Sequence, residues 1–581
     1  MTSTRLKYEG WLYWLAFLIA IGIRFIQLGE SPLTDSEATL ALQSLQIARG
    51  ANPVLGSQPG YILFTSVLFA VIKSTNFMAR FVPALAGSAL VFAPWFFRER
   101  IKPRPALILA FLFAFDPGLV ALARQSSGTI LAVTFILFAW GMWSNRSAIP
   151  AGIFAGLALL SGPSLWAGLL SLGLTWLFIR GMEMKPATEP TEDGATDQST
   201  RQDSDPKITN YDLRSSLLAT LLLGGTLFFT TPNGLSAWLS SLPVYIKGWT
   251  SATVATPGRI LLTFVAYEPL GIFLAILSII RGLRTKSRRI VRLGLWLMVS
   301  LFLAVFYREA GELVWAIIPL LTLGAMELSR SFDIFPEERV EVGVVVTAIL
   351  ILLVYIWFNL SNIALNPIGQ VTIVPIFGEI QNARYLVLYG SLTIVVVCIA
   401  LVAFGWSART ARLGVTWSFA AFLSVYSLAA SWGASGLRSP NGVELWNPDQ
   451  KPVQAGLLLA SVDEVSEFSL GHVDSQPVTI MGINSPALEW LLRDRQVEVV
   501  SNLDPQVAPP IVITPLMDDL SLPSAYRGQD FTWRQRLQWE FVQNSDLLRW
   551  FVFRQLPLEN ETIILWVRDD LFPDARENVI P

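Results

Sequence analysis

The chain has 581 residues, of which 53% are hydrophobic and only 15% are charged, and its mean hydropathy is +0.51. Soluble domains carry more charge and less apolar content, so this balance predicts a membrane protein. The net charge of −2 gives no basic field for nucleic acid. One cysteine (Cys398) and one histidine (His472) exclude an intrachain disulfide and a metal site of several His or Cys ligands.

Apolar runs of membrane-spanning length recur along most of the chain. In chain order they cover 11–28, 58–73, 80–97, 105–123, 127–144, 149–161, 163–180, 214–231, 258–280, 291–306, 312–328, 340–359, 386–405 and 413–432. This pattern predicts a mostly α-helical protein that crosses the membrane many times. No small-residue cleavage site follows the first run, so we expect it to be a retained helix.

Basic loops set the expected orientation. "RERIKPR" (98–104), "RGLRTKSRRIVR" (281–292) and "ARTAR" (408–412) should face the cytoplasm, as should the N-terminus with Arg5 and Lys7. These loops alternate correctly only if run 58–73 is a juxtamembrane or re-entrant helix on the outer side. About thirteen crossings then remain, and the tail after residue 432 lies outside.

Composition divides the chain into four parts. Residues 1–181 form a first membrane region, with an outer loop at 29–79. Residues 182–213 read as a disordered, acidic cytoplasmic linker, and 214–432 as a second membrane region. In 433–581, the segments "PVTIMGI" (477–483), "VEVVS" (497–501), "PPIVITP" (509–515) and "ETIILWV" (561–567) predict strands, and "PALEWLLRD" (486–494) predicts a helix. We therefore expect a small extracytoplasmic α/β domain at this end.

Polar and ionisable residues gather in the segments expected on the outer face. Because such groups are costly at membrane depth unless they are paired or line a wet cavity, their gathering favours an outward-opening cleft. Taken singly, each one is better explained as a helix cap or a headgroup contact. The residues are Asp35, Glu37, Arg80, Arg124, Lys247, Tyr267, Glu268, Arg308 and Glu312.

Four segments resemble one known family of membrane enzymes. They are "SEATLALQSLQIARG" (36–50), "PGYILFTSVLFAVIKSTNFMARFVPALAGSAL" (59–90), "ALARQSSGTILAVTFILF" (121–138) and "AGLALLSGPSLWAG" (155–168). In this order they resemble the GT-C membrane glycosyltransferases of glycosyltransferase family 39, which include protein O-mannosyltransferases and aminoarabinose lipid A transferases. The resemblance implies a short helix after the first loop and an outer C-terminal domain.

Three later segments resemble a prokaryotic subgroup of the same superfamily, the flippase activity-associated proteins. They are "LLTFVAYEPLGIFLAI" (261–276), "REAGELVWAIIPLLTLGAMEL" (308–328) and "LRWFVFRQLPLENETIILWVRDDLF" (548–572). The resemblance implies a prokaryotic plasma membrane protein. Its partners would be a polyprenyl-phosphate-linked sugar and an acceptor at the membrane or cell surface.

The family's reaction implies roles for the outer residues. Sugar transfer from a polyprenyl phosphate with inversion needs a carboxylate to take the acceptor's proton, which we assign to Asp35 or Glu37. It also needs donors that stabilise the departing lipid phosphate, for which Arg80, Arg124, Lys247, Arg259 and Arg308 are candidates. Glu268 and Glu312 would order the acceptor or pair with these arginines, and Tyr267 would also bind substrate. Some relatives use a divalent cation, Mg or Mn, which Asp35 and Glu37 could hold, although the sequence does not demand one.

Some positions depart from the family pattern. Ser36 stands where the family has Asp, Thr129 where it often has Asp, and Ser161 where it usually has Lys. These departures favour an alternative, a non-catalytic protein of the same fold that binds lipid-linked sugar or assists a flippase or cell-envelope assembly system. Asp35 and Glu37 also fit the start of an ordinary helix, with Thr34 or Asp35 as its N-cap.

A transporter is the least favoured of the functions considered. Transporter folds carry inverted repeats and paired broken helices around a central site. The sequence shows neither of these features clearly.

Overall fold

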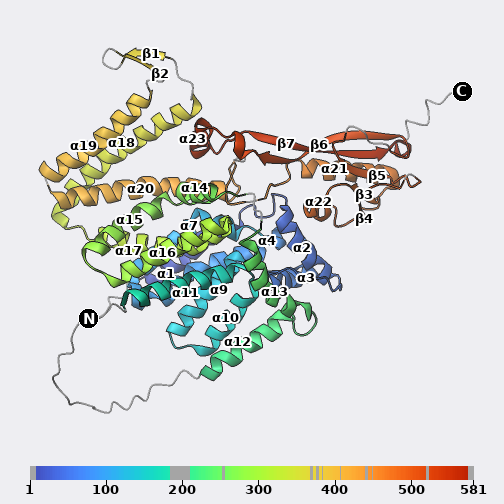
Figure 1. The fold of residues 1–581 in the computed structure, drawn as a ribbon, viewed down its shortest axis with the longest axis horizontal. Helices are drawn as coiled ribbons and strands as arrows, with labels where there is room; N and C mark the ends of the chain where they lie inside the picture. Colours follow the sequence, from blue (N-terminus) through green and yellow to red (C-terminus); the bar gives the residue numbers. More distant parts are fainter. Residues whose placement is uncertain are drawn as a thin grey trace.

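The computed structural model describes residues 8–183, 210–251, 255–366, 371–374, 378–381, 384–405, 407–438, 443–447, 449–504, 506–517 and 522–572. Most of the expected cytoplasmic linker, residues 184–209, lies outside them. Figure 1 shows a broad body of helices and a smaller C-terminal domain with a sheet, which extends from one side of the body. The predicted class, a helical membrane protein with a small C-terminal α/β domain, is confirmed.

The first half of the body is built from short and medium helices. They are α1 (Glu9–Phe25), α2 (Asp35–Ala48), α3 (Pro59–Val71), α4 (Asn76–Ala89), α5 (Ala93–Phe96), α6 (Arg98–Ile101), α7 (Pro103–Phe115), α8 (Pro117–Ala123), α9 (Thr129–Ser144), α10 (Ala148–Leu160) and α11 (Ser164–Glu183). Helices α2 and α3 form the first loop and pack against each other. In position, α3 matches run 58–73, for which a juxtamembrane or re-entrant helix is expected.

The second half contains the longest helices. They are α12 (Asn210–Gly225), α13 (Asn233–Gly248), α14 (Pro257–Tyr267), α15 (Pro269–Arg284), α16 (Arg288–Tyr307), α17 (Val314–Ser331), α18 (Arg339–Leu365), α19 (Arg384–Gly405) and α20 (Ala408–Ala434). Helices α18 and α19 lie at the margin of the body in Figure 1. Much of their apolar surface is exposed, as expected where a helix faces lipid.

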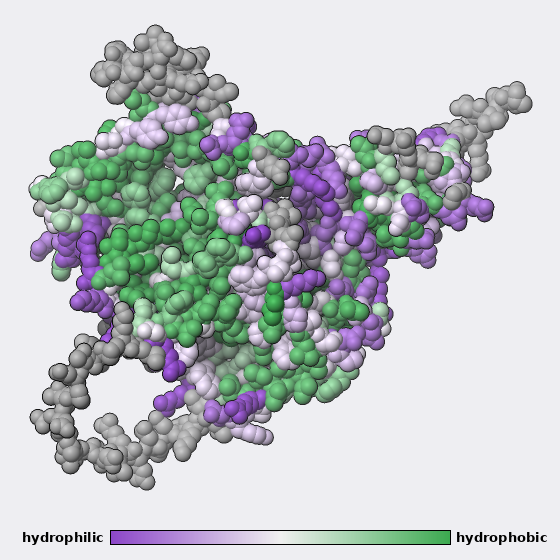
Figure 2. Space-filling model, viewed as in Figure 1, coloured by the Kyte–Doolittle hydropathy of each residue, from purple (hydrophilic) through white to green (hydrophobic). Residues whose placement is uncertain are grey.

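By length and composition, seven helical segments of the described chain can cross a membrane. They are Asn76–Phe96, Ser164–Met182, Arg288–Tyr307, Ala310–Ser331, Pro336–Leu365, Arg384–Gly405 and Ala408–Ala434. Two bent helix pairs raise the number to nine, and three further apolar helices are shorter than 18 residues. The expected count of about thirteen crossings thus includes helices that are short for a full span. Figure 2 shows apolar surface over the body and hydrophilic surface where the body meets the C-terminal domain.

The two bent pairs correct the sequence analysis, which found no paired broken helices. Helix α7 bends by 56° into α8 at Asp116, and α14 bends by 85° into α15 at Glu268. In both pairs a proline follows the acid and begins the second helix. Proline disfavours helical geometry at the residue before it and has no N–H to donate, so each Asp-Pro or Glu-Pro step interrupts the helix.

The C-terminal domain contains a five-stranded sheet in the order β4-β3-β5-β7-β6. Strands β3 (Val478–Met481), β4 (Val497–Val500) and β5 (Ile511–Pro515) are parallel, and β7 (Leu558–Arg568) and β6 (Tyr526–Leu537) add to them in antiparallel pairing. The predicted strands and the helix α22 (Pro486–Leu491) are confirmed. The sequence analysis missed β6, α21 (Ala455–Leu470) and α23 (Asn544–Phe553).

The first loop and the C-terminal domain share one hydrophobic core. Leu33, Ala38 and Ala41 of the loop lie in the same buried cluster as Leu458 and Trp490 of the domain. Helix α2 packs directly against α22. Burial of this surface holds the domain onto the loop, so any site in the first loop lies beneath the domain.

Candidate functional site

Glu37 lies at the centre of the candidate site and also stabilises the start of α2. Thr34 is the N-cap, and its hydroxyl oxygen accepts a hydrogen bond from the Glu37 N–H at 3.4 Å. The Glu37 carboxylate in turn accepts from the Thr34 N–H at 3.0 Å, which completes a capping box. The expectation of an N-cap with Glu37 in the first turn is therefore confirmed.

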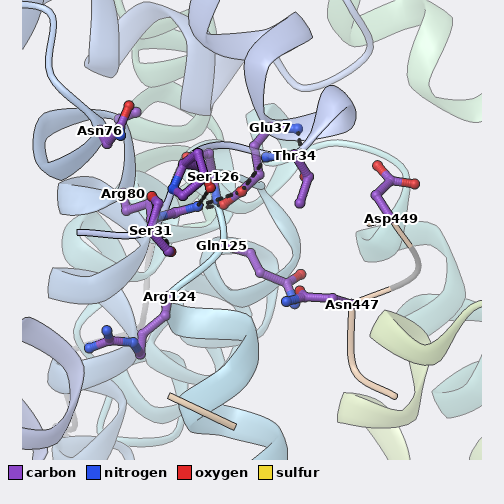
Figure 3. A network of polar contacts seen from close by, with 12 residues as sticks. Ser31, Thr34, Glu37, Asn76, Arg80, Arg124, Gln125, Ser126, Asn447 and Asp449 are labelled. Carbon is purple, nitrogen blue, oxygen red and sulfur yellow. Dashed lines mark hydrogen bonds and ion pairs between the residues drawn. The ribbon is translucent and has the colours of Figure 1, made fainter. Parts of the chain in front are cut away.

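The same carboxylate forms a buried ion pair with Arg80 of α4. Arg80 Nε donates to Oε1 at 2.8 Å, Nη2 donates to Oε2 at 2.7 Å, and the Ser126 N–H donates to Oε1 at 3.0 Å. Figure 3 shows these groups converging on Glu37. Burial would raise the pKa of Glu37, but the charge and hydrogen bonds of Arg80 outweigh it and lower the pKa to about 2. Glu37 is therefore ionised at neutral pH. Its contacts with Arg80 and Ser126 connect three of the four segments that resemble the GT-C family, 36–50, 59–90 and 121–138.

Arg80 also fixes the chain between α1 and α2. Its remaining N–H groups donate to the carbonyl oxygens of Leu28 at 3.2 Å, Ser31 at 2.8 Å and Pro32 at 3.0 Å. A guanidinium presents its donors in a rigid fork, so one side chain can fix several carbonyls and a carboxylate at once. The first loop is held to α4 through this residue.

Asp35 points away from this ion pair and toward the C-terminal domain. One carboxylate oxygen accepts from the Ser485 hydroxyl at 2.7 Å and from the Ala487 N–H at 3.0 Å, while the other pairs with Arg534. The catalytic role of Asp35 and Glu37 stays a prediction, and each carboxylate would have to leave these contacts to act on a substrate.

Arg124 caps the end of α1. Its guanidinium donates to the carbonyl oxygens of Ile23 at 3.1 Å, Arg24 at 2.9 Å and Ile26 at 2.8 Å. These are the carbonyls that a helix end leaves without partners, and a cation there interacts favourably with the helix dipole. Figure 3 shows Arg124 below Arg80, apart from the groups that converge on Glu37.

Lys451 completes the site, and the sequence analysis did not single it out. It makes no hydrogen bond or ion pair with the described residues, although it lies among charged groups. The pKa of Lys451 is lowered to about 8, mainly by burial and further by the positive charges of Arg80 and Arg124. The negative charges of Glu37 and Glu444 oppose this shift. A lone lysine in a polar segment far from the first loop gives no signal in the sequence. Only the docking of the domain brings it to the ion pair.

Two further acids, Glu309 and Asp449, lie near these groups. We use the name junction recess for the resulting cluster of six charged residues, Glu37, Arg80, Arg124, Glu309, Asp449 and Lys451. The Asp449 carboxylate accepts from the Ser36 N–H at 3.1 Å, so it also stabilises the start of α2. Glu309 lies in the turn before α17, close enough to Asp449 for the two carboxyl groups to interact electrostatically. Glu309 is an exposed residue, yet the protein atoms around its carboxyl, followed by the charge of Asp449, raise its pKa.

The other predicted residues lie elsewhere. Lys247 and Arg308 are exposed near the ends of α13 and α16. Tyr267 is fully buried and donates to Glu444. Glu268 is buried at the bend between α14 and α15, and Glu312 accepts from the Ser164 hydroxyl at 3.0 Å inside the body. The structure thus brings Glu37, Arg80 and Arg124 together and distributes the rest of the predicted cleft over separate places.

A further candidate also lies away from the recess. The Arg259 guanidinium lies 5.4 Å from the centre of the Trp539 ring, so it contacts the C-terminal domain through a cation–π interaction.

A divalent ion does not fit Asp35 and Glu37. Their carboxylates bind different partners, Arg534 and Arg80, and each already accepts several hydrogen bonds. Within the described residues, no group of three or more His, Cys, Asp or Glu side chains is placed to hold a metal ion. No step below depends on a metal.

Comparisons with known proteins give structural neighbours but no family. No family model matches the chain. No curated protein matches it. ArnT from Cupriavidus metallidurans is similar in its apo state and in a structure bound to undecaprenyl phosphate, with TM-scores of 0.48 for both and identities of 12% and 14%. These likenesses cover 87% and 88% of this chain and 93% and 94% of the ArnT chains.

An oligosaccharyltransferase from Archaeoglobus fulgidus, tethered with an acceptor peptide, is similar at a TM-score of 0.41 and 14% identity. The likeness covers 84% of this chain and 64% of that one. Both neighbours are glycosyltransferases of the GT-C fold, which the sequence segments also resemble. At these scores and identities the likeness says nothing of the site residues or substrates of this chain.

Proposed function

We propose that the protein transfers a sugar from a polyprenyl-phosphate donor to an acceptor at the outer face of the membrane, with the lipid phosphate bound in the junction recess. The observation that carries this proposal is the ammonium group of Lys451. The charges that act on it most strongly are two arginines and two carboxylates, which balance each other. Lys451 itself makes no ion pair with the described residues, and a phosphate would supply one.

The proposed reaction uses this charge on the leaving group. The bond between the sugar's anomeric carbon and the phosphate oxygen breaks, and the lipid phosphate departs with the electron pair. The acceptor hydroxyl attacks the opposite face of the sugar and loses its proton to a carboxylate, so the configuration inverts. Lys451 stabilises the negative charge that develops on the phosphate.

Among the acids of the junction recess, Glu309 suits the role of general base best. A base works best when its pKa lies near the operating pH, and the pKa of Glu309 is raised whereas that of Glu37 is lowered to about 2. This proposal moves the base away from Asp35 and Glu37, the acids expected from the sequence. Those two would instead hold the first loop and the C-terminal domain in place.

The test is a turnover assay with the purified full chain in lipid. The protein is given polyprenyl-phosphate sugars and a panel of acceptors, and the released polyprenyl phosphate is measured. We expect Lys451→Met to weaken donor binding and Glu309→Gln to abolish release while donor binding persists. Lys73→Met, at an exposed lysine after α3, is the matched control and should change neither. Full turnover by Glu309→Gln, with none by Glu37→Gln or Asp35→Asn in folded protein, would return the base to the sequence-based assignment.

A second candidate is a non-catalytic protein that binds lipid-linked sugar or assists a flippase or assembly system. One observation favours it: both acids of the family-like loop are held in structural contacts. The departures at Thr129 and Ser161 point the same way. Donor binding without release, for every sugar and acceptor tried, would establish this candidate in place of the transferase.

A further inference from the structure

The two helix bends bring a pair of acids together inside the body. Asp116 ends α7 and Glu268 ends α14, and each acid stands immediately before a proline. Their carboxyl groups lie close enough to act on each other, and both lie near the backbone N–H of Gly118. Two interrupted helices therefore meet at their interruptions through side chains of the same charge.

Both acids are removed from water. Asp116 is 4% exposed and Glu268 is 2% exposed. The ring of Trp446 covers Gly118 so closely that a Cβ there would lie 2.7 Å from it. Asp116 Oδ1 accepts from the Leu119 N–H at 2.8 Å, but Asp116 Oδ2 and Glu268 Oε1 have no donor among the described residues. Two facing carboxylates cannot bond to each other, because each offers only acceptors.

The charges around the pair do not balance. The cation that acts on Asp116 most strongly is Arg24, which is fully buried on α1 and whose guanidinium donates to the carbonyl oxygens of Phe113 and Ala114 without forming an ion pair with Asp116. Two carboxylates against one guanidinium leave one negative charge in a dry environment. Such a charge is too costly to persist, and two acids this close ionise one at a time. The nearby Tyr267 offers no compensation, because its hydroxyl is turned to Glu444.

We propose that Asp116 and Glu268 hold one proton between them, and that this shared proton links the two broken helices. The proton supplies the missing donor, so that one carboxylic acid donates to the other carboxylate. It also balances the charge, since the remaining carboxylate is matched by Arg24. This proton site does not depend on the proposed transferase reaction, and either proposal can fail without the other.

Infrared spectroscopy of the full chain in lipid at neutral pH tests the protonation directly. We expect a carbonyl stretching band of a buried carboxylic acid that disappears in Asp116→Asn and in Glu268→Gln. Glu37→Gln is the matched control and should keep the band, because Glu37 is ionised by Arg80. Glu312→Gln and Glu9→Gln identify any contribution from two further buried acids of the described chain. Identical spectra of the wild type and Glu268→Gln at this band would overturn the proposal.

Thermal unfolding tests the link between the helices. Glu268→Gln keeps a donor for Asp116 and should unfold close to the wild type, whereas Glu268→Ala leaves Asp116 without one and should unfold several degrees lower. Equal losses in both variants would contradict a shared proton. The experiment is repeated in sodium, potassium and choline salts. A stabilisation by sodium that Glu268→Gln abolishes would show an alkali cation in place of the proton.

Discussion

The junction recess and the helix bends each contain a charged group without an ion-pair partner among the described residues, and the two groups have opposite sign. In the recess, Glu37 has a full partner in Arg80, and the unmatched group is the ammonium of Lys451. At the bends, Asp116 and Glu268 face each other, and the unmatched charge is negative. A small anion fits the first region and a proton fits the second. Buried charge therefore indicates a ligand only where the protein's own partners do not balance it.

The largest expected effect comes from breaking the balanced pair. Arg80→Met leaves Glu37 charged and buried, which should lower the free energy of unfolding by about 3–5 kcal/mol. Thermal unfolding of the reconstituted protein measures the loss. The double variant Glu37→Gln with Arg80→Met removes both charges and should recover part of it. A single variant as stable as the wild type would mean that the ion pair does not hold the first loop.

Acid should distinguish the two regions. The folded-state pKa of Glu37, about 2, lies below its usual 4.5, so its stabilisation is complete above about pH 4.5 and is lost as the pH falls toward 2. The shift corresponds to roughly 3 kcal/mol. The acid pair at the bends already holds its proton and should add little to this loss. The free energy of unfolding should therefore depend less steeply on pH, from neutral to acidic pH, in Glu37→Gln than in the wild type. In Glu268→Gln the dependence should be unchanged.

Local patterns in the sequence predicted much of the fold. Apolar runs predicted the membrane helices, and short β-branched runs bounded by turns predicted four of the five strands in the C-terminal sheet. The strand β6 was missed because its sequence, "YRGQDFTWRQRL", is polar for an edge strand that pairs only with β7. The bends were missed because Asp116 and Glu268 fall inside continuous apolar runs.

Contacts between distant parts of the chain decided the rest of the site. The capping box of Thr34 and Glu37 is local and could be expected from "TDSE". The partner of Glu37 is 43 positions away, and that of Asp35 is 499 positions away. Residue spacing in a single sequence does not predict ion pairs between such distant positions. The family resemblance located the first loop, but the docked domain determines which way each acid points.

A charge swap tests the contact between Asp35 and the C-terminal domain. Asp35→Arg places two cations together and should lower stability by about 1–2 kcal/mol, because the pair is only partly buried. Adding Arg534→Asp reverses the pair and should restore much of the loss, together with any lost turnover. Recovery of stability without recovery of turnover would show that Asp35 has a chemical role besides its domain contact.

The smallest expected effect concerns the unmatched ammonium in the recess. Because the pKa of Lys451 is lowered to about 8, its charge is lost as the pH rises from about 7 to 9. Binding of polyprenyl phosphate should then weaken by about tenfold, the contribution of one charge-assisted hydrogen bond. In Lys451→Met the affinity should already be low and should not change over this range. A pH dependence that survives in Lys451→Met would assign the phosphate to other cations and leave the recess without its proposed ligand. We expect Asp116→Asn and Glu268→Gln to leave the binding of polyprenyl phosphate unchanged, because a pair of acids does not attract an anion.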